Sequence, residues 1–183
     1  ISPDEELEMF EMDFFDPETA LIVTNGKFNP PTKAHGAMIE DLFALAEEKQ
    51  QKGFKPIVMI FTPPKDHYIK TNTSVIRKQT NIKTRKKTIL SDKDRVSLLE
   101  NICKQIIRNN KLFKNINFKV VPLNFMIFKN KYRDKYKKKE IASLSIVVGS
   151  DRYPGNMSIW TKTERNTGNM SNSRKNNMKI YVK

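Results

Sequence analysis

The sequence predicts an α/β protein with a parallel sheet, and two observations support this prediction. Short apolar runs rich in β-branched residues are typical of strands buried on both faces, and such runs lie at 20–23, 57–61, 118–122 and 145–148. Apolar residues at helical spacing fill the intervals near 35–51 and 91–109. Because strand, helix and strand in succession form a right-handed unit with parallel strands, we expect a Rossmann-like three-layer fold.

Composition indicates one globular domain. The 183 residues are 38% hydrophobic and 30% charged, which suffices for a single core. We expect a domain at 19–183, preceded by an acidic segment at 1–18 whose aromatic residues pack against it. Its C-terminal part is expected to be atypical or incomplete, since 161–183 has too few apolar residues for ordinary core. The chain starts at Ile1, so we expect these residues to belong to a longer protein.

The cysteine content indicates the cellular compartment, and the net charge indicates the kind of partner. Cys103, the only cysteine, falls on an apolar helical face, so we expect packed core in a reducing compartment, cytoplasmic or nuclear. No apolar run reaches a membrane span, and the acidic start lacks the parts of a signal peptide. The net charge of +14 favours a polyanion, whether a nucleotide, RNA or an acidic membrane surface, without choosing among them.

Two basic segments have competing interpretations. The segment at 63–90 shows little periodicity and follows a strand at the edge where α/β sheets bind ligands, so we expect a substrate loop. The run at 129–139 contains two tyrosines that could stack on nucleic-acid bases. The solvated face of a linking helix is the favoured interpretation of that run.

The second helix is predicted to begin at Ser91. Asp94 follows three residues later, as in a capping box, and Asn109 and Asn110 end the pattern. Residues at helical spacing along one side form its expected buried stripe, which consists of Val96, Leu99, Cys103 and Ile106.

The most informative stretch is the turn between the first strand and its helix. The apolar run ends near Gly26, Pro30 and Pro31 stiffen the following loop, and His35 stands where the helical pattern begins. Amides at a helix start lack intrahelical partners and lie at the positive end of the helix dipole, so the turn suits a phosphate. His35 would add a donor there. The alternative is a tight turn whose histidine caps the helix or packs.

The pattern from Gly26 to His35, Gly-x-Phe-Asn-Pro-x-Thr-x-x-His, resembles the nucleotide-binding signature of the nucleotidyltransferase superfamily. Many members end this signature with His-x-Gly-His. The Thr-x-x-His form present here is most similar to nicotinamide-nucleotide adenylyltransferases and some viral relatives. The string at 86–96, Lys-Lys-Thr-Ile-Leu-Ser-Asp-Lys-Asp-Arg-Val, also resembles the family, and the resemblance covers most of 20–160.

The resemblance implies that AMP moves from ATP to a phosphate-bearing acceptor, nicotinamide mononucleotide above all, with release of pyrophosphate. It implies catalytic roles for His35, Thr32 and Lys27. The implied nucleotide-binding residues are Gly26, Phe28, Asn29, Gly149, Asp151, Ser171, Ser173 and Arg174. The implied acceptor-binding residues are Trp160, Lys65, Lys86 and Lys87. Mg²⁺ is expected to come with ATP, because neither histidine, His35 or His67, has Cys or His partners at ligand spacing.

Two of these positions have structural alternatives. Asp151, in the Gly-x-Asp string after the last strand, would accept from the ribose hydroxyls or the adenine amino group, or would cap a turn or helix. Trp160 is the only tryptophan and would stack on the pyridine ring of the acceptor, or would be a half-buried packing residue.

The resemblance weakens at the motif that closes the family's site at the start of a late helix. Ser171 and Ser173 fit this motif, but its arginine position falls on Asn176. Either Arg174 or Lys179 substitutes, or the sequence omits residues here, or this part of the site is impaired.

Other functions remain open. The acceptor could be a phosphocholine-like, glycerol phosphate, flavin or pantetheine phosphate group, with CTP in place of ATP. The basic runs and the altered last motif also allow an RNA-binding protein on an inactive nucleotidyltransferase scaffold. The expected partners are a nucleoside triphosphate and a small phosphate-bearing acceptor, with nucleic acid less favoured, no membrane, and a homo-oligomer allowed.

Overall fold

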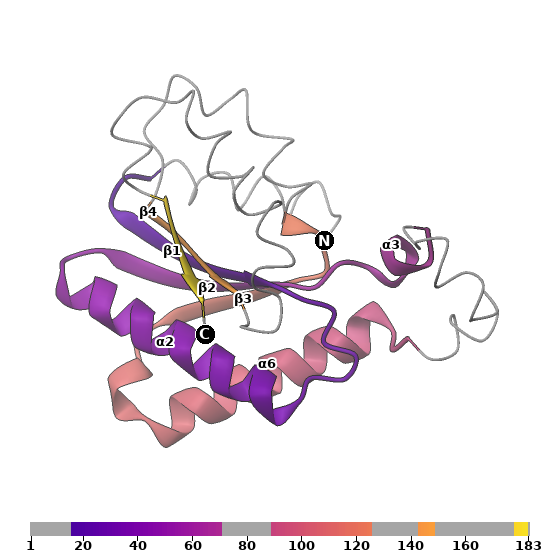
Figure 1. Ribbon diagram of the computed structural model, residues 1–183. Helices are drawn as coiled ribbons and strands as arrows, with labels where there is room; N and C mark the ends of the chain where they lie inside the picture. Colours follow the sequence, from indigo (N-terminus) through magenta and orange to yellow (C-terminus); the bar gives the residue numbers. More distant parts are fainter. Residues whose placement is uncertain (1–15, 71–88, 126–142, 149–177, 183) are drawn as a thin grey trace, which may run out of the picture.

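The computed structural model describes residues 16–70, 89–125, 143–148 and 178–182. These residues form one five-stranded sheet in the order β3-β2-β1-β4-β5, and every neighbouring pair is parallel (Figure 1). The α/β class with a parallel sheet is therefore confirmed. The strands are β1 (Thr19–Asn25), β2 (Lys55–Phe61), β3 (Asn117–Val121), β4 (Ser143–Val148) and β5 (Met178–Val182).

The strand order reverses at β1, the central strand. From β1 the chain moves outward to β2 and β3 on one side, while β4 and β5 lie on the other side. A reversal of this kind is the point at which open α/β sheets bind ligands, outside the carboxyl ends of the strands. The switch point falls between β1 and β4.

The two long helices, α2 (Lys33–Gln51) and α6 (Asp92–Asn109), lie on the same face of the sheet (Figure 1). Helix α2 packs over β1 and β2, α6 packs beside it over β3, and the 3₁₀ helix η1 (Lys111–Phe113) follows α6. Their apolar side chains and those of the strands form one buried cluster, in which Ile22, Ile39, Leu42, Phe43, Val58, Ile60, Leu99 and Cys103 are 0% exposed.

The opposite face of the sheet is buried as well. Val23 and Ile146 are 0% exposed, and Leu21, Met59 and Leu144 are at most 3% exposed. Because successive side chains of a strand point to opposite faces, these residues do not face α2 and α6. The sheet is therefore buried on both faces, which agrees with the expected three-layer fold.

The structure corrects the predicted stripe of the second helix. Leu99 and Cys103 are buried as expected, but the third fully buried member is Arg95, and Val96 is only half-buried. The predicted ends of the helix are right, since Ser91 is the N-cap and accepts from the Asp94 amide at 3.1 Å. Arg95 lies four residues before Leu99, so it continues the same side of the helix.

Two elements were not expected from the sequence. A short helix, α3 (Lys65–Lys70), begins inside the segment predicted to be a substrate loop. Strand β5 lies inside 161–183, which was not expected to form core. In the described sheet β5 is an edge strand that pairs only with β4, so it needs fewer apolar residues than a central strand. Lys179 lies in β5, so the end of the predicted late-helix motif is a strand.

Several predictions fall on residues outside the described ones. They concern the packing of the acidic segment at 1–15, most of the substrate loop at 71–88, and the basic run at 129–139. Among the helices in the described parts of the chain, none combines the length and the apolarity needed to cross a bilayer.

Cys103 makes the stability of the fold depend on pH. Burial, and secondarily the charge of Glu100, raises the pKa of this thiol to about 12, whereas an unfolded cysteine ionises near about 8.5. Between these values only the unfolded state loses the proton, so the free energy of unfolding falls as pH rises, by up to about 1.4 kcal/mol per pH unit.

We expect Cys103→Ala to remove this contribution. Urea unfolding between pH 7 and pH 10.5 should show a steeper loss of stability in the wild type than in the variant above about pH 8.5. Parallel curves, offset by a constant, would contradict the prediction.

Candidate functional site

The turn that follows β1 is held by a buried aromatic ring. The Gly26 amide donates to the Phe61 carbonyl oxygen at 3.0 Å, which ties the end of β1 to the end of β2. Phe28 has a φ of 49°, and the residue is 2% exposed. A Cβ placed on Gly26 would lie 2.9 Å from Cζ of Phe28. The signature therefore has glycine here because the phenylalanine ring folds back onto its backbone.

Gly26→Ala is expected to destabilise the fold by about 1–3 kcal/mol, because the buried Phe28 ring must shift to admit the methyl group. Gly36→Ala is the matched control, since a Cβ there meets nothing within 4 Å, and helix propensity should make it neutral or stabilising by up to about 1 kcal/mol. Urea denaturation of both variants checks the pair. Equal effects would show that ring contact does not select Gly26.

His35 caps the helix that leaves this turn. The Thr32 amide donates to Nδ1 of His35 at 2.9 Å, and the His35 amide donates to Oγ1 of Thr32 at 3.3 Å, which completes a capping box. The ring also packs edge-on against Phe28, with centroids 4.9 Å apart. The alternative interpretation, in which the histidine caps the helix or packs, is thus correct for Nδ1, which caps, and for the part of the ring that contacts Phe28. Because Nδ1 accepts, the neutral imidazole carries its proton on Nε2.

The first turn of α2 is open to solvent. Thr32, Lys33 and Ala34 are exposed, His35 is half-buried, and a Cβ added to Gly36 would meet nothing within 4 Å. The turn starts at the carboxyl edge of β1, on the switch-point side of the sheet. A helix N-terminus in this position presents backbone N–H groups and the positive end of its dipole to an anion.

Strands β1 and β4 part near this edge. Their ladder runs from Ala20 to Val23, whereas the ladder between β1 and β2 continues to Asn25. Beyond Val23 the hydroxyl of Thr24 donates to the Val147 carbonyl oxygen at 2.9 Å. A side chain thus replaces the backbone pairing where the switch point opens.

The segment after β3 reaches the same edge. The Thr62 amide donates to the Val121 carbonyl oxygen at 2.9 Å, and the Phe125 amide donates to Oδ1 of Asn25 at 3.5 Å. Nδ2 of Asn124 lies 3.3 Å from Nε2 of His67 in α3. Residues that follow three different strands therefore meet beside the turn.

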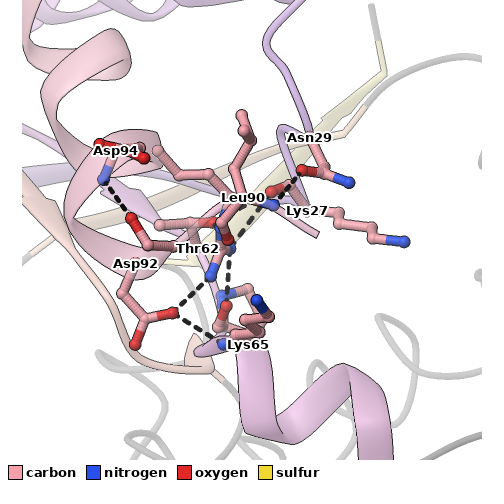
Figure 2. Close-up of polar contacts among 10 residues, drawn as sticks. Lys27, Asn29, Thr62, Lys65, Leu90, Asp92 and Asp94 are labelled. Atoms are coloured by element: carbon pink, nitrogen blue, oxygen red, sulfur yellow. Dashed lines mark hydrogen bonds and ion pairs between the residues drawn. The ribbon is translucent and has the colours of Figure 1, made fainter. Parts of the chain in front are cut away.

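A buried arginine joins these loops to α6. Arg95 is 0% exposed, and Figure 2 labels several of its partners, among them Thr62, Leu90 and Asp92. Its Nη1 donates to Oγ1 of Thr62 at 2.7 Å, to the Pro63 carbonyl oxygen at 2.8 Å and to the Lys27 carbonyl oxygen at 3.3 Å. Its Nη2 pairs with Oδ1 of Asp92 at 2.6 Å, and its Nε donates to the Leu90 carbonyl oxygen at 3.2 Å.

Three predicted site residues take part in or adjoin this network. The Lys65 amide donates to Oδ1 of Asp92 at 2.8 Å, and the Leu90 amide donates to Oδ1 of Asn29 at 2.8 Å. The side chain of Lys27 points away from the network, while its carbonyl oxygen faces Arg95 (Figure 2). The structure thus brings Lys27, Asn29 and Lys65 together, along with Gly26, Phe28, Thr32 and His35 in the same turn.

The remaining predicted site residues lie outside the described ones, although β4 ends at Val148, directly before Gly149. They are Lys86, Lys87, Gly149, Asp151, Trp160, Ser171, Ser173 and Arg174.

Sequence reasoning missed Arg95, Asp92 and Thr62. In the sequence Arg95 belongs to the string at 86–96 that resembles the family, and this resemblance implies no role for it. The available signal was its spacing, since Arg95, Leu99 and Cys103 follow one another at four-residue intervals. A charged residue on an apolar stripe is seldom buried without partners.

The donors at the turn suit an anion. Amides at a helix start, an imidazole N–H and nearby lysines are hydrogen-bond donors, whereas Mg²⁺ takes oxygen ligands. Among the described residues, no three His, Cys, Asp or Glu side chains gather closely enough to hold a metal ion.

Fold and turn together define a Rossmann-like parallel α/β protein with an open helix N-terminus at its switch point. No protein-family model matches the chain, and no curated protein matches it. Among solved structures it is similar to Plasmodium falciparum nicotinic acid mononucleotide adenylyltransferase complexed with APC, at 13% identity and a TM-score of 0.45. The match covers 90% of this chain and 74% of that chain. This similarity is too weak to assign an activity.

Proposed function

We propose that the chain is a nucleotidyltransferase that moves AMP from ATP to a phosphate-bearing acceptor, nicotinamide mononucleotide first among them. The observation that supports this is the exposed N-terminus of α2 at the carboxyl edge of β1, whose signature histidine caps through Nδ1 and carries its proton on Nε2. The signature residues and the anion-binding geometry point to the same ligand, a triphosphate.

In the proposed reaction an oxygen of the acceptor phosphate attacks the α-phosphorus of ATP in line. A new P–O bond forms, the bond between the α-phosphorus and the bridging oxygen breaks, and pyrophosphate leaves with that electron pair. Such chemistry depends mainly on positioning and on stabilising the charge of the leaving group. No side-chain nucleophile is needed.

The residues of the turn would perform this work. Nε2–H of His35 donates to the triphosphate, Thr32 contacts a neighbouring phosphate oxygen, and the backbone from Gly26 to Phe28 holds the nucleotide with Lys27 and Asn29 beside it. Mg²⁺ would be held by the triphosphate oxygens and would neutralise charge on the pyrophosphate. The turn itself offers hydrogen-bond donors, which suit the anion and not the cation.

Residues outside the described ones complete the proposal on the strength of the resemblance. Gly149 and Asp151 would hold the nucleoside, and Ser171, Ser173 and Arg174 would hold the triphosphate. Trp160 would stack on the acceptor ring, while a lysine among Lys86, Lys87 and the described residue Lys65 would neutralise the β- and γ-phosphates.

Pyrophosphate release tests the proposal directly. The chain is incubated with Mg²⁺ and either ATP or CTP, together with one acceptor at a time: nicotinamide mononucleotide, phosphocholine, glycerol phosphate, or flavin or pantetheine phosphate. We expect release with ATP and nicotinamide mononucleotide, and none without an acceptor. Release with another combination of nucleotide and acceptor would identify that combination as the substrates. No release with any combination would overturn the proposed function.

The alternative of an RNA-binding protein on an inactive nucleotidyltransferase scaffold rests on the basic runs of the sequence and on its altered last motif. It predicts RNA binding that weakens steeply with salt, without turnover. Measuring RNA affinity at two salt concentrations beside the pyrophosphate assay separates the two functions.

A further inference from the structure

Arg95 is more than a core residue. Its guanidinium is fully buried, and its carboxylate partner Asp92 is 43% exposed. Burying a charge is unfavourable unless the group is paired and hydrogen-bonded, and apolar residues often replace buried ion pairs without loss of stability. A leucine at this place in the stripe of α6 would need no polar partners of its own, but the acceptors that Arg95 now satisfies would lose their donor. The presence of a charged residue here is explained by the acceptors that the N–H groups of Arg95 bind.

The acceptors of Arg95 come from three separate stretches of chain. Lys27 belongs to the turn after β1, Thr62 and Pro63 follow β2, and Leu90 and Asp92 lead into α6. Figure 2 shows these stretches converging on one cluster of contacts. The rigid, planar guanidinium group of Arg95 thus fixes the distances between three loops at the carboxyl edge of the sheet.

The network sets the direction of one peptide group in the turn. The Lys27 carbonyl oxygen receives Nη1 of Arg95 at 3.3 Å and the hydroxyl of Thr62 at 3.2 Å. In a planar trans peptide the C=O and the following N–H point in opposite directions. Holding the Lys27 carbonyl toward Arg95 therefore turns the Phe28 amide away from Arg95.

Asp92 extends the same control to the neighbouring helix. Its Oδ1 accepts from both Nη2 of Arg95 at 2.6 Å and the amide of Lys65 at 2.8 Å. Lys65 begins α3, so one carboxylate oxygen couples the turn after β1 to the start of α3.

We propose that Arg95 and Asp92 are positioning residues, which orient the Phe28 amide toward the nucleotide phosphates and hold Lys65 beside them. This inference rests on the proposed function, because it assigns to the pair the alignment of the same triphosphate site. Neither residue touches the substrate. Both act through the backbone of Lys27, Phe28 and Lys65.

The test uses variants that keep the size of each side chain. Asp92→Asn removes the charge, and Arg95→Lys keeps the charge but loses the planar fork. Asp94→Asn is the control, because Asp94 is an exposed carboxylate in the same first turn and contacts Ser91 through its backbone amide. For each variant we would measure the free energy of unfolding, the Kd for ATP by calorimetry, and KM and kcat for pyrophosphate release.

We expect Asp92→Asn and Arg95→Lys to raise the Kd and KM for ATP by about ten- to a hundredfold at temperatures where they remain folded. Asp94→Asn should stay within about twofold of the wild type. A purely structural pair would lower the amount of folded, active protein without changing KM or Kd. Unchanged KM and Kd in both variants would therefore overturn the inference.

Hydrogen exchange separates this inference from the proposed function. Exchange of the Gly26, Lys65 and Leu90 amides in the nucleotide-free chain should be about tenfold faster in Arg95→Lys than in the wild type, relative to amides in the middle of α2. If the wild type binds no ATP, the proposed function fails, and these rates alone decide whether Arg95 positions the loops. Equal rates would overturn it.

Discussion

A chain carrying His35→Glu is expected to be as stable as the wild type and yet to release pyrophosphate at least about 100-fold more slowly. Glutamate is a preferred residue at the third position of a helix, where its carboxylate accepts from the N-cap amide. It can replace Nδ1 of His35 as the acceptor for the Thr32 amide. A carboxylate near a helix N-terminus is also favourable for the dipole.

The same substitution places a negative charge where the triphosphate would lie and removes the N–H donor at Nε2. Loss of one donor to a reacting oxyanion typically costs about 100- to 1000-fold in rate. His35→Ala should lose this donor as well and also about 0.5–2 kcal/mol of stability, because the cap is broken. Comparing the two variants separates capping from catalysis.

The measurements are urea unfolding and pyrophosphate release under the same conditions, with a stable wild-type fold as the reference. Activity retained in His35→Glu would restrict His35 to capping and packing. That outcome would remove the main support for a triphosphate at the start of α2.

Arg95→Met is expected to lower the free energy of unfolding by about 3–5 kcal/mol, because several buried acceptors lose a donor. Methionine fills a similar volume, so the loss comes from polar atoms rather than from a cavity. The Pro63 and Leu90 carbonyl oxygens and the Thr62 hydroxyl would lose the donor that Arg95 supplies, and the Lys27 carbonyl oxygen would keep only the Thr62 hydroxyl. Leaving buried acceptors without partners carries the desolvation penalty of each group.

For a chain of this size such a loss corresponds to a fall in melting temperature of roughly 10 °C. Arg108→Met is the matched control, because Arg108 is an exposed arginine in the last turn of the same helix, and its loss should cost less than about 0.5 kcal/mol. Scanning calorimetry or urea unfolding measures both. Equal effects at the two positions would show that the buried network contributes nothing to the free energy of unfolding beyond helix propensity.

Much of the fold could be predicted from the sequence because the relevant forces are local. Continuous apolar runs at 20–23 and 57–61 read as buried strands, and Ser91 marks the start of α6 because a hydroxyl satisfies an orphan amide. The same holds for the turn at Gly26 to His35, where glycine, prolines and histidine occur at fixed offsets.

One strand of the sheet could not be predicted from the composition of its segment. Strand β5 (Met178–Val182) joins β4 at the edge of the described sheet, and its surroundings at 161–177 are polar. A short edge strand obtains its hydrogen bonds from a neighbour distant in sequence, so local hydrophobicity gives little sign of it.

The sequence by itself determined the class of fold and the turn in which a phosphate would be expected, since both depend on periodicity and on backbone chemistry within a few residues. Only the tertiary structure decided what holds that turn in place. The contacts from Arg95 to Thr62 and Lys27 span 33 and 68 residues, and the role of a buried guanidinium is defined by partners that only folding brings within reach. For the same reason the sequence left open whether His35 caps or binds, and the structure shows that its Nδ1 caps.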